Sequence, residues 1–263
     1  MGKRSTWALP YFIFLLLFVA LPLLLIAVYA FMDDNGGFTL QQFVKFAHES
    51  ETINTLTYSI QTALVTTALC LLIGYPAAYI LAQNTRRSGG MGFAKVTVML
   101  FILPMWVNML VRTLATVALF DFLNAPLGEG ALIFGMVYNF LPFMIFPIYN
   151  VLEKMDNSYV EAAEDLGATP AQVLRKVIIP LSMPGVTSGI MMVFMPTIST
   201  FAIAELLTMN KVKLFGTTLQ ECINNGMWNY GACLALIMLI LIGVTMLYSD
   251  DSQAETNETG GLI

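Results

Sequence analysis

Long apolar stretches constrain the fold of this chain more than any other feature of its sequence. Crossing the roughly 30 Å hydrocarbon core of a bilayer takes about 20 apolar residues in a helix. Six stretches reach that length, at 10–31, 52–83, 96–120, 130–152, 177–204 and 222–249, and only the third holds a charged residue. Because lipid cannot satisfy open backbone groups, and the stretches lack the alternation of barrel strands, we predict an all-α polytopic membrane protein with six transmembrane helices.

The composition excludes an ordinary water-soluble fold. Charged residues make up 11% of the chain and apolar residues 57%, whereas soluble domains carry about 25% charged residues. Most of the net charge of −5 comes from the tail 249–263, which holds four acidic residues and no Lys or Arg. No basic stripe exists to release counterions from phosphates, so we predict no nucleic-acid partner. The tail itself has the composition of a disordered segment.

The distribution of Lys and Arg predicts the orientation of the spans. The first stretch follows two basic residues, as a signal peptide would, but it is too long and no small-residue cleavage site precedes Asp33, so we interpret it as a retained span. With a cytoplasmic N-terminus, eight of the 12 basic residues lie inside, namely Lys3, Arg4, Arg86, Arg87, Lys95, Lys154, Arg175 and Lys176. Since cytoplasmic loops carry the excess of basic residues, we expect both termini to be cytoplasmic.

Two kinds of site are not predicted. Cys70, Cys222 and Cys233 are odd in number and have no paired spacing, which argues against a disulfide framework or a metal site. The glycines of the basic loop 84–92 lack the spacing of a phosphate-binding loop and follow no strand. We therefore expect no metal, nucleotide or other cofactor to be bound by this chain.

The loop 153–176 is the most strongly patterned connection. It has 24 residues, although a helical hairpin needs only a few. Ser158 and Glu161 have the spacing of a capping box, which predicts a helix from Tyr159. Gly167 is suited to end that helix in a left-handed conformation. A second N-terminal signal, Thr-Pro-x-Gln at 169–172, predicts another helix that runs into the fifth span.

The first helix of this loop needs a partner. Tyr159, Ala163 and Leu166 are predicted to share its apolar face. At about eight residues it is too short to be stable alone in water. It either lies at the level of the headgroups and packs under the bundle, or docks into a groove on a cytoplasmic protein, and the residues alone leave both readings open.

The same loop resembles the EAA signature of the permeases of ATP-binding cassette (ABC) importers. Glu161, Ala162 and Ala163 are followed, after three intervening residues, by Gly167 and, after nine more, by a segment that ends at Pro180. That segment reads Val-Ile-Ile-Pro where the signature has Ile-x-Leu-Pro, a mild departure. In this family the loop forms a coupling helix that seats in a cleft of the ATP-hydrolysing subunit.

Neighbouring segments resemble one branch of that family. Residues 104–112 are similar to a P-x-W-x-N-x-L-x-R segment, and residues 135–156 are similar to the spermidine/putrescine permeases, in particular to the first (B-type) of their two permease subunits. The resemblance covers roughly residues 10 to 248. It implies a MetI-like type I ABC importer permease fold with six spans.

The resemblance also implies domains and partners. We expect an N-terminal helix and outer loop at 1–54, a type 1 transmembrane domain at 55–248 that contains the coupling loop 153–176, and the acidic tail at 249–263. The implied function is that of a permease subunit for polyamine uptake across the bacterial cell membrane, or for another small organic solute. The implied partners are a second, different six-span permease, a dimeric ATPase that uses ATP and magnesium, and an extracytoplasmic polyamine-binding protein. This chain would then not be an enzyme.

Within the coupling loop, the resemblance assigns the contact with the ATPase to particular residues. They are Glu161, Ala162, Ala163, Asp165, Gly167 and Pro180. Glu161 either pairs with a basic residue of the ATPase or closes its own helix cap, and the two roles are compatible.

Five residues are candidates for the interior of the pathway. Arg112 is the only charge within the predicted spans, for which we favour a structural or gating role over contact with a cation. Glu205, at the outer end of the fifth predicted span, would attract a polycation, with an ordinary solvated carboxylate as the alternative. Trp106 and Tyr138 would add cation–π contacts, and Asn108 lies beside them in sequence.

Three other functions compete with this interpretation. An ion-coupled carrier usually needs ionisable residues at mid-membrane, and the spans offer only Arg112. A membrane-embedded enzyme needs a cluster of His, Asp, Glu or Cys at one depth, which the spans do not contain. A purely structural membrane subunit is the third alternative, and only the patterned loop 153–176 argues against it.

Overall fold

The computed structural model describes residues 10–33, 36–87 and 93–260, with the backbone alone at 87, 93–95 and 248–260. Lys3, Arg4 and the glycines at 89, 90 and 92 lie outside the described residues, as does the end of the acidic tail. Apart from one isolated bridge between Met32 and Phe38, the described ranges contain helices, turns and loops without a named strand. The prediction of an all-α fold is confirmed.

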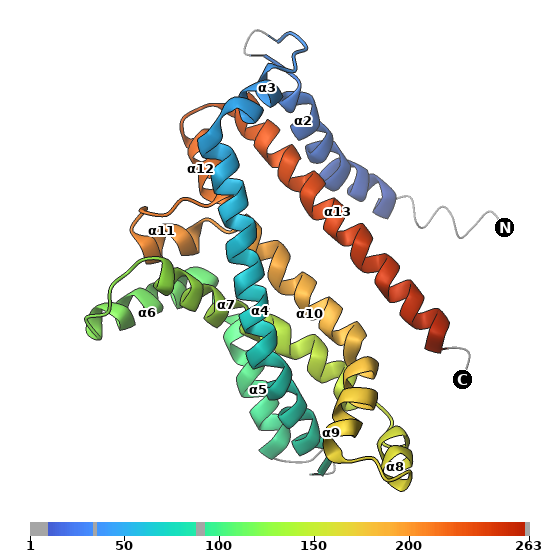
Figure 1. The fold of residues 1–263 in the computed structure, drawn as a ribbon. Coiled ribbons are helices and arrows are strands. Elements are labelled where there is room, and N and C mark those ends of the chain that lie inside the picture. Colours follow the sequence, from blue (N-terminus) through green and yellow to red (C-terminus); the bar gives the residue numbers. More distant parts are fainter. Residues whose placement is uncertain (1–9, 34–35, 88–92, 261–263) are drawn as a thin grey trace, which may run out of the picture.

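The helices follow one another with few long connections (Figure 1). Their bounds are η1 Leu16–Ala20, α2 Leu21–Ala30, α3 Gln41–His48, α4 Ser50–Arg87, α5 Phe93–Trp106, α6 Met109–Phe122, α7 Glu129–Lys154, α8 Ser158–Asp165, α9 Pro170–Val173, η2 Leu174–Ile178, α10 Ile179–Ser199, α11 Ala202–Thr208, α12 Phe215–Asn224 and α13 Trp228–Gly260. Among the described residues, five helices are long and apolar enough to cross a membrane, and a sixth span is obtained if one bent pair is counted as a single crossing.

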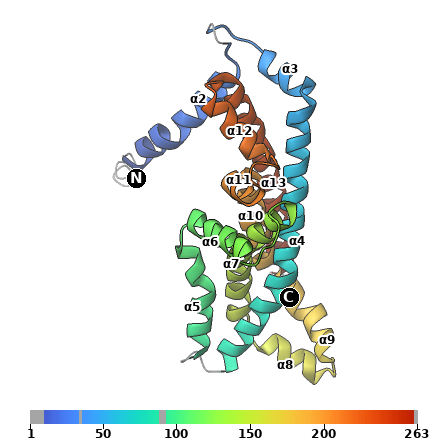
Figure 2. The ribbon, with the colours of Figure 1, turned by 90° about the vertical axis from the view of Figure 1, so that its left-hand side faces the viewer.

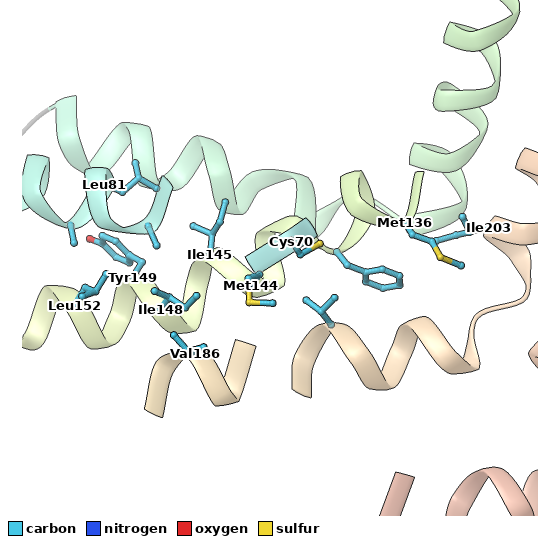
Figure 3. Close-up of a cluster of buried hydrophobic side chains, with 14 of the residues drawn as sticks. Cys70, Leu81, Met136, Met144, Ile145, Ile148, Tyr149, Leu152, Val186 and Ile203 are labelled. Carbon is cyan, nitrogen blue, oxygen red and sulfur yellow. The ribbon is translucent and has the colours of Figure 1, made fainter. Parts of the chain in front are cut away.

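The centre of the molecule is formed by α4, α7 and α10. In the most apolar stretch of α7, 56% of the residues are buried, whereas in that of the first span, Pro10–Ala30, none is buried. Met144, Ile148 and Val186 meet between α7 and α10, and Cys70 and Leu81 cover them from α4 (Figure 3). Hydroxyl groups add polar ties, such as the 2.9 Å hydrogen bond between Tyr75 and Ser182. The largest buried share among the candidate spans of the described residues identifies α7 as the core of the bundle.

The first and last spans form a pair beside this core. Helices α2 and α13 lie side by side and run along the outside of the central bundle (Figure 1). At the α3 end of the molecule, Tyr230 of α13 donates a hydrogen bond to Glu49, and the ammonium group of Lys45 lies 4.2 Å from the centre of the Tyr230 ring. This cluster ties the start of α13 to α3 and α4. The Tyr230 hydroxyl also holds the pKa of the Glu49 carboxyl below its usual range.

The third predicted span is not a single straight helix. It consists of 96–106 and Met109–Phe122, which meet at 96° (Figure 2). Asn108 breaks it, because its backbone is extended and its side chain accepts a 2.8 Å hydrogen bond from the amide of Leu110. An asparagine that caps a helix in this way starts a new one rather than continuing the old one. The prediction of an unbroken span at 96–120 did not take the segment from Pro104 to Asn108 into account, although it signals the break.

Other predicted boundaries also differ from the structure. The fifth span ends at Ser199 and the sixth begins at Trp228, because 202–208 and 215–224 form separate short helices. Helix α13 continues to Gly260, so the backbone of 249–260 is helical and not disordered; once a helix is nucleated, each further residue adds a hydrogen bond. The predicted domain boundaries at 54/55 and 248/249 fall inside α4 and α13.

A side chain of α4 caps a helix far away in sequence. The backbone amide of Phe215, at the start of α12, donates a 2.7 Å hydrogen bond to the hydroxyl oxygen of Ser59, which is 1% exposed. We expect Ser59→Ala to lower stability by about 1–3 kcal/mol, because it leaves a buried amide without an acceptor. Thermal melting of the purified protein measures this. Thr57→Ala is the control, since that exposed hydroxyl bonds only to its own helix; equal melting of both variants would contradict the prediction.

Candidate functional site: the α8 loop and the bent helix pair

The loop between the fourth and fifth spans forms one end of the molecule. Helix α8 and the start of α9 lie at the opposite end from α3 and α12 (Figures 1 and 2). Glu161, Ala162, Asp165 and Gly167 are exposed, and Ala163 is half-buried. The residues that carry the EAA resemblance are therefore largely accessible at the tip of the molecule.

The start of α8 differs from the predicted capping box. The helix begins one residue earlier, at Ser158, whose backbone amide donates a 3.0 Å hydrogen bond to the Asp156 carboxylate. That hydrogen bond lowers the pKa of Asp156. The Ser158–Glu161 box is wrong, because a carboxylate two residues before Ser158 accepts the bond instead. The Glu161 side chain is thus left exposed and is not used as a cap.

The apolar face of α8 is also rotated from the prediction. Val160 and Ala163 pack against the core, whereas the side chains of Tyr159 and Leu166 are 57% and 89% exposed. The predicted face of Tyr159, Ala163 and Leu166 is wrong for packing within the chain. Residues three apart share a helix face, and the bundle contacts the face that begins at Val160. Two apolar side chains are thereby left on the outer surface of the loop.

The turn after α8 is as predicted. Gly167 has φ +79°, in the left-handed region that costs other L-residues roughly 1–2 kcal/mol. Two residues on, the amide of Thr169 donates a 2.9 Å hydrogen bond to the Gln172 side chain, and Pro170 occupies the first position of α9. The second capping box is confirmed, and α9, η2 and α10 continue as one apolar span, Pro170–Ser199.

The end of the signature coincides with a widened helical turn. Residues Leu174–Ile178 form a π-helical segment directly before α10, whose second residue is Pro180. Proline lacks an amide donor and its ring clashes with the carbonyl four residues earlier, and a widened turn accommodates both effects. Pro180 itself is exposed.

Arg112 lies just beyond the bend between α5 and α6. Its side chain is only 6% exposed, and its Nη1 donates a 3.3 Å hydrogen bond to the backbone carbonyl of Asn139 on α7. The Asn139 amide group donates in turn to the carbonyl of Gly135, at 2.8 Å. Among the described residues, the Nε of Arg112 and the Oδ1 of Asn139 find no partner. The arginine thus joins the bent pair to the central helix.

The other pathway candidates are spread over the elements around this point. Trp106, at the end of α5, is 88% exposed, and Tyr138 on α7 is 43% exposed. Asn108 is the cap of α6. Glu205 lies on α11 and not at the end of the fifth span, because the chain breaks at Thr200, and its side chain is half-buried. In the described part of the chain, no hydrogen bond joins these four side chains.

A polar groove that the sequence reading overlooked runs along the α3-proximal half of α4. Glu51, Tyr58 and Gln61 line it from α4, and Glu129 closes it from the first turn of α7. Glu129 is not among the site residues predicted from the sequence. Its position at a helix N-terminus, where negative charge is favoured, was the available signal.

Comparison with known proteins identifies relatives of the chain. Residues 74–251 match the family described as the inner membrane component of binding-protein-dependent transport systems. The spermidine/putrescine transport system permease protein PotB of Escherichia coli K12 is 32% identical over 257 residues, which cover 89% of this chain and 91% of that protein. PotB of Haemophilus influenzae is 31% identical over 256 residues, which cover 89% and 88%.

Solved structures of low sequence identity share the fold. A bacterial ABC transporter involved in the import of the acidic polysaccharide alginate matches with a TM-score of 0.73 at 15% identity, over 96% of this chain and 95% of that chain. The MetNI methionine ABC transporter, in an inward-facing conformation, matches with a TM-score of 0.61 at 16% identity, over 78% and 95%. The predicted MetI-like fold is therefore confirmed.

Proposed function

This chain belongs to the family of binding-protein-dependent transport system inner membrane components, and from that membership we propose that it forms, with a second permease, the pathway for spermidine and putrescine uptake by an ABC importer. The observation that carries the choice of substrate is its identity with polyamine permeases over nearly the whole chain. Another small organic solute is the alternative within the same family.

The α8 loop would connect this pathway to ATP hydrolysis. Its tip exposes Glu161 and Ala162, together with the apolar side chains of Tyr159 and Leu166. Exposed apolar groups on a short helix fit a groove on another protein, and such burial would stabilise a helix too short to persist alone. We propose a dimeric ATPase as that protein. ATP hydrolysis would then take place in the ATPase, and this chain would bind the ATPase through α8 and change conformation with it.

The excess of basic residues at one end indicates how the chain would be oriented in the membrane. Arg86 bonds to Asn157 beside α8, Lys154 ends α7, and Arg175 and Lys176 lie in η2. This α8 end would be the cytoplasmic side. The α3 end would then face the extracytoplasmic binding protein. Both termini would be cytoplasmic.

Reconstitution tests the function directly. The permease is placed in liposomes with the second permease and the ATPase, and radiolabelled spermidine is added with the binding protein. Uptake that requires ATP and survives an ionophore is expected. Uptake that stops with the ion gradient would identify an ion-coupled carrier instead, and uptake of a different solute alone would identify the alternative substrate class.

Glu205 is the carboxylate that we propose for contact with the polycation. Its half-buried place on α11 would strengthen charge pairing relative to an exposed site. We expect Glu205→Gln to lower spermidine uptake about tenfold, since hydrogen bonds to charged groups contribute roughly 1.5–3 kcal/mol. The control is Glu221→Gln, because Glu221 pairs on the surface with Lys213 at 2.7 Å. Wild-type uptake by the Glu205 variant would remove this residue from the pathway.

We propose that Arg112 has a structural or gating role in the pathway and does not bind the substrate. A guanidinium would repel a polycation, and its hydrogen bond to the carbonyl of Asn139 fixes the bent pair to α7. Trp106 and Asn108 lie at that bend and Tyr138 lies on α7, and they would contact the substrate by their aromatic faces and amide group.

A further inference from the structure

The α8-proximal end of α4 carries an arginine whose hydrogen bonds reach both α7 and the segment that connects α7 to α8. Arg86 Nη2 donates to the backbone carbonyl of Leu152 and, at 2.7 Å, to that of Met155. Its Nη1 donates to the Asn157 side chain at 3.0 Å. A single guanidinium therefore holds the end of α7 and both ends of the connecting segment 155–157, whose last residue, Asn157, precedes α8.

The geometry fits the chemistry of arginine. Leu152 lies in the last turn of α7, where carbonyls have no partner within the helix and carry a partial negative charge. A guanidinium presents several donors in a rigid plane, so it satisfies carbonyls from two directions at once. In the segment that follows, the Met155 backbone is extended and its side chain packs against the core, and Asp156 accepts a hydrogen bond from the neighbouring Ser158 amide.

Packing beside these hydrogen bonds is incomplete. A cavity of about 260 Å³ separates α4 from α8 and α9, and Tyr79, Gln83 and Glu164 are among the residues that line it, together with Arg86. Within the described ranges, Arg86 is the only side chain whose hydrogen bonds join α4 to the segment 155–157. Without it, the apolar contacts of Val160 and Ala163 and the packing of α8 on α9 and η2 would remain, but α8 would have no hydrogen-bonded link to α4 among the described residues.

We propose that Arg86 is a positioning residue that makes α8 and α4 move as one body, so that displacement of α8 reaches the central bundle. This inference rests on the proposed function, because it assumes that a partner displaces α8. Helix α4 packs along both α7 and α10. A rigid link at its end would therefore pass the movement of the loop to all three central helices.

The assembled transporter in liposomes tests this role. We expect Arg86→Gln to assemble and hydrolyse ATP at the wild-type basal rate, while spermidine taken up per ATP falls at least about tenfold, since three bonds from a charged donor are lost. Arg86→Lys keeps the charge without the planar fork and should recover part of the ratio. Asn157→Ala removes one acceptor and should have a smaller effect. The matched control is Arg175→Gln, an exposed arginine of the same loop.

A distance measurement separates coupling from folding. Spin labels at Asn84 on α4 and Ser158 on α8, both exposed, should give a narrow distance distribution in the wild-type complex and a broad one with Arg86→Gln. An unchanged uptake-to-ATP ratio, an unchanged distribution, or loss of assembly in all Arg86 variants would overturn the proposal. Failure of the proposed function looks different, because the wild-type complex itself would then show no ATP-driven uptake.

Discussion

Gly167→Val is expected to reduce uptake more than tenfold while the protein still inserts and assembles. The residue ends α8 with φ +79°, and a Cβ added there meets no atom within 4 Å. The effect must therefore come from the backbone and not from a clash. A β-branched residue is strongly disfavoured in the left-handed region, so the turn between α8 and α9 would open and α8 would leave its position. Uptake into vesicles, normalised to the amount of assembled transporter, measures this.

The matched variant is Gly167→Asn. Asparagine adopts the left-handed region far more readily than valine, although its side chain is similar in size. It should keep most of the uptake. Equal loss by both variants would mean that the side chain and not the backbone matters, and normal uptake by Gly167→Val would show that the turn is not needed for coupling.

Gly185→Leu is expected to disrupt the central bundle. A Cβ at Gly185 would lie 2.9 Å from the carbonyl oxygen of Pro147 and 3.0 Å from the Cα of Ile148. Both are backbone atoms of α7, so they cannot turn aside as the end of a flexible side chain can. Overpacking of this kind costs about 1–3 kcal/mol or more. We expect a melting temperature lower by several degrees and less folded protein after detergent extraction, as measured by size-exclusion chromatography and thermal melting.

The matched control is Gly243→Leu. Gly243 lies on α13, and a Cβ there meets nothing within 4 Å. Replacing a helical glycine relieves a propensity penalty of about 1 kcal/mol, so this variant should be neutral or slightly stabilised. If the two leucine variants melt alike, the close approach of α7 and α10 does not contribute to the stability of the bundle.

The number and order of the long helices could be predicted from the sequence, because apolar length alone decides which segments can cross a bilayer. The second and fourth spans were placed to within a few residues, at α4 and α7. The bend at Asn108 was overlooked, since an apolar run does not reveal where the chain turns. Capping by a side chain is a local event that the average hydropathy of a window conceals.

In the loop 153–176, the turn at Gly167 and the start of α9 were predicted correctly, whereas the cap and the packed face of α8 were not. Gly167 and the Thr169–Gln172 box depend on local backbone rules, and both are confirmed. The apolar face of α8 depends on which side the bundle approaches, and that is set by tertiary packing. The tie through Arg86 could not be predicted for the same reason, because its acceptors lie about 70 residues away in sequence.

One cross-linking measurement tests most directly whether α8 connects the permease to ATP hydrolysis. A cysteine is placed at Ala162, which is exposed on α8, and a matched cysteine at Ala47, which is exposed on α3 at the opposite end. The three native cysteines are buried. A short bifunctional reagent should join position 162, and not position 47, to the ATPase in the assembled transporter. No cross-link from position 162, or labelling of that position from outside intact cells, would contradict the account.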